Sequence, residues 1–313
     1  NKTQMISVNV DELNELGGGC HTCSEEDLNI HSEVLDDYNT MCLNRRWFHE
    51  NAELSFEEYK TAERIVKLLK NIGIVDKDIY EGIGKTGVCA IIYGCAGDGP
   101  CIMLRADMDA LPIQEAATGI EYTSKNAGCM HACGHDGHMA SLICAAKILF
   151  NNKNNLRGSI KLCFQPAEEG RNGATAMIKD GLLEGEGGGK CGGPRVDYVY
   201  GIHLWSFNRL GEVMCSNGPV MAASDKFIID VKGSGGHGAV PHKANDAIVS
   251  AANLVTSLQT IVSRNVDPLE SGVVTVGTIN GGFGYNIIAD QVTIMGTARA
   301  FTKETQEKIK TRM

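Results

Sequence analysis

Apolar residues recur at helix-like and strand-like spacings along most of the chain. Between residues 26 and 69 they return every three or four positions, which predicts two helices separated by the stretch 47–55, where the period is lost. Short apolar runs then predict buried strands, at 87–93, 101–106, 159–164 and 198–204. Helical periods lie between these runs, notably at 139–150 and 174–183. Strands that alternate with helices predict an α/β sheet with both faces covered.

A second pattern begins near Pro219. The strand expected there alternates, so that Phe227, Ile229 and Val231 share one face. It is followed by an expected helix, two strands and a charged helix, at 245–262, 272–279, 291–299 and from Lys303. This β-α-β-β-α order predicts a compact α+β module of about 95 residues. The chain is therefore divided into a polar tail (1–26), a first domain (27–219) and a second domain (220–313).

The composition is that of a soluble globular protein, with 43% hydrophobic and 21% charged residues among 313. A net charge of −9 without a basic stripe argues against a nucleic-acid partner. No apolar run reaches the roughly 18 residues of a membrane helix. The start of the sequence is polar and acidic and lacks a signal-peptide pattern, so we expect a cytoplasmic protein.

Cysteine usage agrees with a reducing compartment. Several of the twelve cysteines lie in apolar patterns, as reduced core residues do. Cys20 and Cys23 have the spacing of a redox or zinc motif, but the second pair that such a motif needs is missing.

The densest chemistry lies in residues 130–138, which place a thiol, three imidazoles and a carboxylate close together. Cys133 and His135 can converge because Gly134 permits a turn between them. A thiolate beside an imidazole suits zinc or another late divalent ion. Further candidate ligands follow two predicted strands, namely the adjacent Glu168 and Glu169, and His203.

Each of these residues has an ordinary alternative. A single buried cysteine usually fills the core, adjacent glutamates are usually solvated, and a histidine at a strand end is more often a surface residue than a ligand. The joint pattern favours a metal site, because three clusters fall at element boundaries, where sites on α/β sheets are built. His131 and His138 can equally be packing residues at the start of a helix, and they are left out of the candidate site.

Five motifs resemble a family of metal-dependent amidohydrolases that includes hippurate hydrolase, aminoacylase-like enzymes and the plant hydrolases of indoleacetyl-amino acids. They are RADMDALP from Arg105, CGHDGH from Cys133, QPAEEG from Gln165, GSGGHGAVPH from Gly233 and GTAR from Gly296. The resemblance extends from about Leu28 to the last residue. It is highly specific, because all five motifs occur in the family's order.

The resemblance implies a fold of two domains. The first is expected to be a catalytic, metal-binding α/β domain with a mixed sheet like that of zinc aminopeptidases. The second is expected to be an inserted, ferredoxin-like α+β domain that serves as a lid and as the contact of a homodimer. In the resembled family the chain then returns to the catalytic domain, where a further histidine binds metal. The last histidine here is His242, in the expected lid, so we expect that return segment and that ligand to be missing from the sequence.

The resemblance also implies the chemistry. Two divalent ions, of zinc, manganese, nickel or cobalt, would activate water and polarise an amide carbonyl. Their ligands would be Cys133, as a bridging thiolate, with His135, Glu169 and His203. Glu168 would be the general base, which takes a proton from the attacking water and delivers it to the leaving amine. Asp107 and Asp109 would orient a liganding histidine.

Three residues of the expected lid complete the site that the resemblance implies. His237 would stabilise the tetrahedral oxyanion at a neighbouring active site, and Asn286 would be a further polar contact to the substrate. Arg299 lies on the polar face of its strand with Thr293 and Thr297, and its guanidinium suits the capture of a carboxylate. A plain surface arginine is the alternative at this position.

We therefore predict a hydrolase that cleaves N-acyl or aryl-acyl amino acids into a carboxylic acid and an amino acid. A dipeptidase or other exopeptidase of the same mechanism is the nearest alternative. Without the further histidine ligand, an inactive metal-binding homologue with a regulatory or binding role is a second alternative. Zinc storage is a third, and it would not need His237 or Arg299. The acyl group itself is not predicted.

Overall fold

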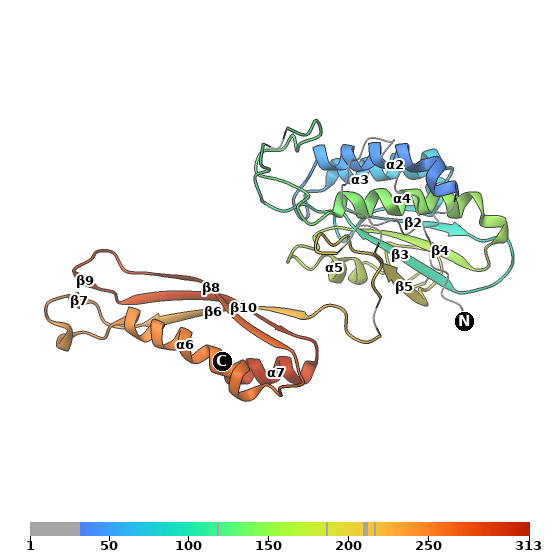
Figure 1. Ribbon diagram of the computed structural model, residues 1–313. Coiled ribbons are helices and arrows are strands. Elements are labelled where there is room, and N and C mark those ends of the chain that lie inside the picture. Colours follow the sequence, from blue (N-terminus) through green and yellow to red (C-terminus); the bar gives the residue numbers. More distant parts are fainter. Residues whose placement is uncertain (1–31, 118, 186, 209–211, 216) are drawn as a thin grey trace. The chain divides into compact units, whose positions relative to one another are not determined.

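The computed structural model describes residues 32–313 apart from 118, 186, 209–211 and 216 (Figure 1). The expected polar tail (1–26) and the Cys20–Cys23 pair lie outside these residues. Contacts divide the chain into two compact units, with the boundary between Glu212 and Val213.

The first unit is built on a five-stranded mixed sheet, which confirms the expected α/β architecture. The strand order is β1-β2-β4-β3-β5. The strands are β1 (Ile79–Ile83), β2 (Gly87–Tyr93), β3 (Cys101–Asp107), β4 (Ser159–Gln165) and β5 (Tyr198–Gly201). Strands β3, β4 and β5 run parallel, whereas β2 is antiparallel to both β1 and β4. The carboxyl ends of three parallel strands therefore lie at the same edge of the sheet, where α/β proteins place their sites.

Helices cover both faces of this sheet (Figure 1). Helices α2 (Ser32–Glu50), α3 (Tyr59–Ile72) and α4 (His135–Asn151) pack on one face, and α5 (Gly173–Lys179) packs on the other. Successive residues of β2 point to opposite faces of the sheet and contribute to the apolar cluster on each face. Val88 and Ala90 pack with the three helices, and Cys89 packs with Met177 of α5. Two short 3-10 helices complete the unit, η1 (Asp76–Asp78) and η2 (Lys153–Asn155).

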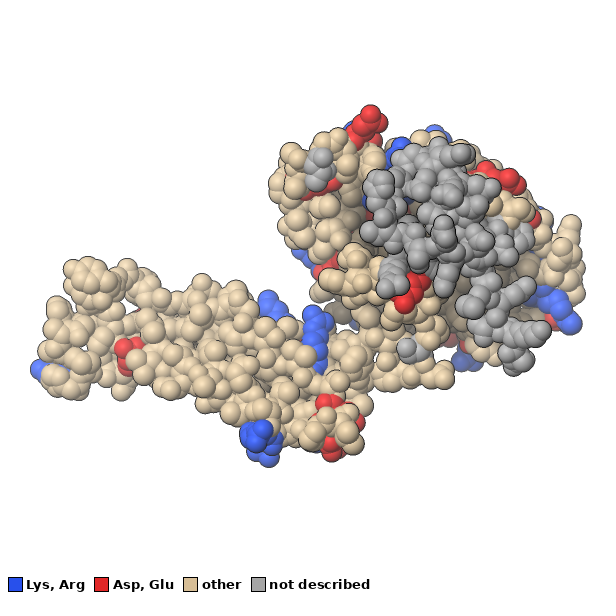
Figure 2. Space-filling view, in the orientation of Figure 1, with Lys and Arg blue, Asp and Glu red and all other residues tan. Residues whose placement is uncertain are grey.

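The second unit is an antiparallel sheet of three strands, in the order β6-β10-β8, with helices on one face. Its elements are β6 (Ala223–Lys232), β7 (Gly236–His237), η3 (Pro241–Lys243), α6 (Ala247–Asn265), β8 (Gly272–Gly281), β9 (Ile287–Ile288), β10 (Gln291–Ala300) and α7 (Lys303–Arg312). Phe227 and Ile229 pack against the helices, as the alternation predicts. The other face is exposed and carries apolar side chains, namely Ile228 and Val273. Few charged side chains are visible on this unit in Figure 2.

Several elements differ from the prediction. Helix α5 ends at Lys179 rather than at residue 183, and the two-residue strands β7 and β9 were not predicted. Helix α2 continues through Glu50, so the loss of the apolar period near Trp47 does not mark the end of the helix. No prediction covered β1, and β5 ends before the apolar run that predicted it. The reason at α2 is that it buries polar residues, and these hide the helical period. They are Asp37, Asn44 and His49.

Helices that could cross a membrane are absent from the described ranges, since none is both long and apolar enough.

Candidate metal centre

The carboxyl ends of the parallel strands gather most of the predicted site residues of the first unit. Asp107 is the last residue of β3, Glu168 and Glu169 follow β4, and His203 follows β5. The segment that leads into α4 adds the thiol and the first liganding imidazole of the CGHDGH motif.

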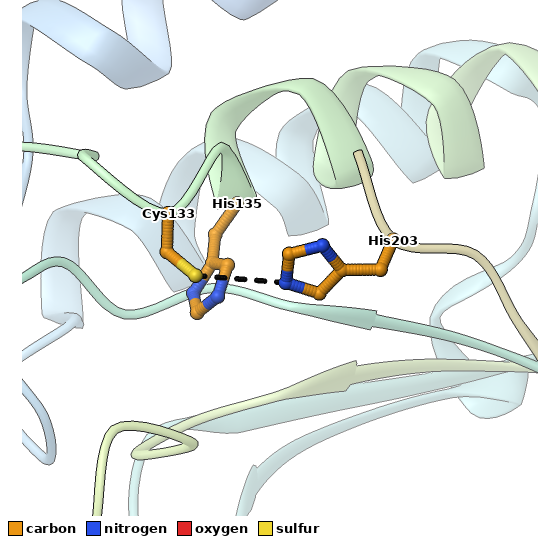
Figure 3. Close-up of side chains that lie close together, drawn as sticks. All are labelled: Cys133, His135 and His203. Carbon is orange, nitrogen blue, oxygen red and sulfur yellow. Dashed lines mark hydrogen bonds between the residues drawn. The ribbon is translucent and has the colours of Figure 1, made fainter. Parts of the chain in front are cut away.

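A glycine turn joins Cys133 to His135. Gly134 has a φ of 83°, a left-handed conformation that favours glycine, and it directly precedes α4. Gly137, in the first turn of α4, lets the segment after β5 approach closely. A Cβ at this position would lie 2.4 Å from the side chain of Leu204, the residue after His203. The approach places Cys133 Sγ 3.5 Å from His203 Nε2 (Figure 3).

Hydrogen bonds fix the tautomers of both imidazoles. His135 Nδ1 donates to the carbonyl oxygen of Asp109 at 2.8 Å, and His203 Nδ1 donates to the carbonyl oxygen of Leu204 at 2.6 Å. A carbonyl oxygen only accepts, so each Nδ1 carries the proton and each Nε2 presents a lone pair. Both rings are therefore prepared to bind a cation through Nε2.

Three buried side-chain atoms of the candidate ligands and of Asp109 have no hydrogen-bond partner among the described residues, namely His135 Nε2, Glu169 Oε1 and Asp109 Oδ1. The first two lie 3.8 Å apart. Leaving buried acceptors unpartnered is costly, and two of them side by side fit a cation. Cys133 and His203, and separately Glu168 with Glu169, offer ligand atoms within 4.8 Å of a nitrogen of His135. The residues thus fit a divalent ion with sulfur, nitrogen and oxygen ligands.

The electrostatics of the site favour a bound cation. Burial opposes a charge on His135, but its hydrogen bond to Asp109 raises the pKa of the ring above its usual value. Burial, together with the negative charge of Glu169, raises the pKa of Cys133 to about 12. This thiol therefore needs a neighbouring cation to ionise near neutral pH. Burial and the neighbouring Glu169 also raise the pKa of Glu168, which suits a group that accepts and returns a proton.

Asp109 supports two candidate ligands at once. Its carbonyl oxygen accepts from His135, and its Oδ2 accepts from the backbone N–H of Glu169 at 3.1 Å. The hydroxyl of Ser55 donates to the same Oδ2 at 2.7 Å. Asp109 thereby ties the first histidine of α4 and the glutamate after β4 into one network, the kind of contact that orients metal ligands.

His138, left out of the site on sequence grounds, links Asp107 to the segment after β5. Its Nδ1 donates to Asp107 Oδ1 at 2.6 Å, and its Nε2 accepts from the N–H of Leu204 at 2.7 Å. Asp107, His135 and His138 lie close enough to hold an ion, but both ring nitrogens of His138 are already engaged. The contact with Leu204 instead positions the backbone next to His203. The available sequence signal was the spacing, because residues three apart on a helix share a face.

His131 is buried beside the site, and its ring nitrogens have no hydrogen-bond partner in the described part of the chain. Burial lowers the pKa of His131 to about 4, so the ring is neutral at neutral pH. No role follows from these contacts.

The predicted residues of the second unit lie in two places. His237 in β7 pairs with Ile287 in β9, and Asn286 directly precedes that residue. The N–H of Gly238 donates to the carbonyl oxygen of Asn286 at 2.8 Å. His237 and Asn286 are therefore exposed neighbours. Arg299 is also exposed, but it lies next to the last residue of β10, whereas Asn286 precedes the first residue of that strand. The fold of this unit does not bring Arg299 to them.

Comparisons with known proteins agree on one family. The sequence profile of peptidase family M20/M25/M40 matches residues 103–310. An N-acetyl-L-cysteine deacetylase of Bacillus subtilis (strain 168) is 48% identical over 268 residues, which are 86% of this chain and 61% of that protein. A hippurate hydrolase of Campylobacter jejuni is 45% identical over 280 residues, which are 90% of this chain and 69% of that protein. The chain thus spans about 61% of the length of the deacetylase.

A crystal structure described as a dinuclear metal-binding peptidase of family M20, also from Bacillus subtilis, has a similar fold. It is 34% identical to this chain and superimposes with a TM-score of 0.68. The match covers 88% of this chain and 67% of that chain.

Proposed function

The chain belongs to peptidase family M20/M25/M40, and we propose that it is a metal-dependent amidohydrolase that cleaves N-acyl or aryl-acyl amino acids. Relatives named for N-acetyl-L-cysteine deacetylation and for hippurate hydrolysis support this substrate class. The observation that carries the proposal is the pair of unpartnered buried atoms, His135 Nε2 and Glu169 Oε1, beside Cys133, His203 and Glu168.

The proposed mechanism divides the work among the residues of the first unit. The ligands that would hold two divalent ions are Cys133, His135, Glu169 and His203, with Asp107 and Asp109 orienting them. When bound, such ions activate water and polarise the amide carbonyl. Glu168 takes a proton from the attacking water and returns it to the leaving amine. The raised pKa of Glu168 supports both transfers, because a group that accepts and then donates a proton works best when its pKa lies near the working pH.

We propose that the second unit, residues 220–313, is a lid and the contact of a homodimer. Its exposed sheet face supports this with apolar side chains, namely Ile228 and Val273. The few charges visible on the unit in Figure 2 point the same way. In the lid, His237 would stabilise the oxyanion, Asn286 would contact the substrate and Arg299 would capture a carboxylate.

The proposed surroundings of the enzyme follow from its charge and its thiols. The net charge of −9 gives no support to a nucleic-acid partner. All cysteines in the described ranges are free, which supports a reducing compartment such as the cytosol. We therefore propose a cytoplasmic enzyme whose partner is a small N-acyl amino acid.

Glu168→Gln tests the function. The metal-reconstituted protein is assayed on N-acyl amino acids, N-aroyl amino acids and dipeptides, and metal content is measured by mass spectrometry. We expect hydrolysis of acyl amino acids that falls about 10²- to 10⁴-fold in the variant, with the metal retained. Glu81→Gln, at an exposed glutamate of β1, is the matched control. Normal turnover by Glu168→Gln would remove Glu168 from the mechanism, and faster cleavage of dipeptides would favour the exopeptidase alternative.

His237→Ala tests the role of the lid. Loss of one oxyanion donor should slow catalysis by about 10²- to 10³-fold and leave the metal content unchanged. His242→Ala, at an exposed histidine of η3, is the control and should remain active. If a dimer shares its sites, mixing His237→Ala with Glu168→Gln should restore activity, and sedimentation should show the dimer. Wild-type rates in His237→Ala would contradict the assignment.

A further inference from the structure

Glu58 is a buried carboxylate that no proposed step uses. It directly precedes α3, and its side chain is fully buried. Its Oε1 accepts from the backbone N–H of Ala167 at 2.9 Å, and its Oε2 accepts from the hydroxyl of Thr86. Both of these donors are neutral. Burial raises the pKa of Glu58, since a buried carboxylate is unfavourable unless hydrogen bonds compensate it. The groups that this carboxylate holds in place therefore indicate its role.

The carboxylate of Glu58 joins three turns with unfavourable backbone conformations. Non-glycine residues with a left-handed φ are uncommon, and the described part of the chain contains four, namely Phe56, Lys85, Ala167 and Asn172. Phe56 (φ 65°) lies two residues before Glu58, and Lys85 (φ 89°) directly precedes Thr86. Ala167 (φ 52°) is itself a hydrogen-bond partner of Glu58. Such conformations persist where the surrounding structure over-determines them, and Glu58 is the group that these three turns share.

The turn at Ala167 determines where the two glutamates of the site point. Successive side chains of an extended strand point to opposite faces, so Glu168 and Glu169 could not both face the site if β4 continued. Strand β4 ends at Gln165, and the left-handed Ala167 turns the chain one residue before Glu168. As a result, both glutamates offer an oxygen within 4.8 Å of a nitrogen of His135.

We infer that Glu58 is a positioning residue for the metal centre: by accepting the N–H of Ala167, it holds the left-handed turn that aims Glu168 and Glu169 at one point. This inference rests on the proposed function, since it concerns the same site. Its first consequence is nevertheless the affinity for a divalent ion, which can be measured without any substrate. Loss of the Ala167 hydrogen bond should weaken that affinity, and the rate should fall with it.

Glu58→Leu removes the acceptor and keeps a side chain of similar size. The probe is cobalt(II), whose affinity is read from an absorbance titration of the full chain, because thiolate ligation by Cys133 gives a charge-transfer band. We expect Glu58→Leu to bind cobalt at least about tenfold more weakly, as is usual when a residue that orients metal ligands is lost. Glu58→Gln should stay within about threefold of the wild type, since its amide oxygen still accepts from the Ala167 N–H.

Thr86→Val is the matched control. It removes the other hydrogen bond of Glu58 and leaves the one to Ala167, so it should lower the melting temperature, as Glu58→Leu does, without weakening cobalt binding. Equal losses of cobalt affinity in Thr86→Val and Glu58→Leu would show a merely structural role and overturn the inference. Unchanged cobalt affinity in Glu58→Leu would overturn it as well.

A second substitution provides a rescue. Glycine adopts a left-handed φ without steric cost, so adding Ala167→Gly to Glu58→Leu should recover most of the cobalt affinity, and no recovery would contradict the inference. If Glu58→Leu does not fold, amide hydrogen exchange of the wild type tests whether the Ala167 N–H is held in place. The Ala167 N–H should then be as protected as the amides of β4, and exchange at the rate of an open loop would reject the role of Glu58.

Failure of this inference and failure of the proposed function give different results. Cobalt affinities in the expected order, without turnover of any substrate, would retain the role of Glu58 and reject the amidohydrolase. Turnover of acyl amino acids, with cobalt affinities that do not change when Glu58 is substituted, would retain the amidohydrolase and reject the role of Glu58.

Discussion

His135 donates its Nδ1 proton to the carbonyl oxygen of Asp109 and so leaves Nε2, which faces Glu169, free to accept. His203 is arranged in the same way by the carbonyl oxygen of Leu204. The backbone therefore selects the tautomer of both rings before any ion binds. The thiol of Cys133 is different, because as a ligand it would have to lose a proton.

Cys133 should make metal binding depend on pH. Burial, and the charge of Glu169, raise its pKa to about 12, so the thiol is protonated at neutral pH and would release its proton on ligating a cation. The apparent affinity for cobalt should rise about tenfold per pH unit between roughly pH 7.5 and 9. Calorimetric titrations in two buffers of different ionisation enthalpy should detect one proton released per thiolate formed.

Cys133→Ser should bind cobalt more weakly and lose this proton release. Cys129→Ser is the control, because Cys129 is a buried thiol outside the group of candidate ligands. An affinity that does not change with pH, or equal effects of the two substitutions, would rule out thiolate ligation by Cys133.

The sequence predicted the neighbourhood of the site better than the contacts within it. Glu169 and His203 could be expected near one another, because parallel strands end at a common edge. The spacing places His138 on one helix face with His135, but the contacts of His138 and Glu58 could not be predicted. Each accepts from a backbone N–H, of Leu204 and Ala167 respectively, and only the folded turns place those groups within reach.

Among the elements, α2 shows why a helix boundary can be hidden. It packs against α4 through polar contacts, with Asp37 paired to Lys147 at 2.5 Å and His49 to Asp136 at 2.8 Å. Such residues interrupt the apolar period although they lie on the buried face. The three long strands of the second unit were easier to predict; β6, for example, buries one face only and so alternates regularly.

His49 should make the packing of α2 on α4 depend on pH. Its Nδ1 contacts Asp136 at 2.8 Å and its Nε2 contacts Glu115 at 3.1 Å. Both partners are carboxylates, so the doubly protonated ring fits best, and the hydrogen bond to Asp136 raises the pKa of His49 against the effect of burial. With a pKa raised on folding, the contribution to stability is complete below the unfolded value of about 6.5. It is lost as the pH rises through the folded pKa.

His49→Phe should therefore be less stable than the wild type by roughly 1–3 kcal/mol at pH 5.5, and by less at pH 8.5. The free energy of unfolding in urea, measured on metal-free protein, checks this. Lys147→Met removes the ion pair with Asp37 and should show a deficit that does not change over this range, because lysine stays charged. A deficit for His49→Phe that grows with pH would reverse the sign and reject the argument.

Across the whole molecule, each hydrophobic cluster draws its described residues from a single unit. The clusters around β2 contain only residues of the first unit, and those around β10 contain only residues of the second. We therefore expect two transitions in scanning calorimetry. Cobalt at about one hundred times its dissociation constant should raise only the transition of the first unit, by about 5–10 °C.

The same experiment with Cys133→Ser should show a smaller shift at the same cobalt concentration, because the substitution weakens binding. A single transition that moves as a whole with cobalt would mean that the two units unfold together, and the separate cores would then not be independent.

Strand β5 is the least supported strand at the metal centre. Within the described residues it pairs with β3 alone, and all four of its residues are exposed. Edge segments with few buried contacts open locally at the lowest free energy. Because His203 follows β5 closely, each fraying of this edge would carry its imidazole away from Cys133. An ion bound there would slow the fraying, so the lifetime of the complex should be set by the opening of a strand rather than by the escape of the ion.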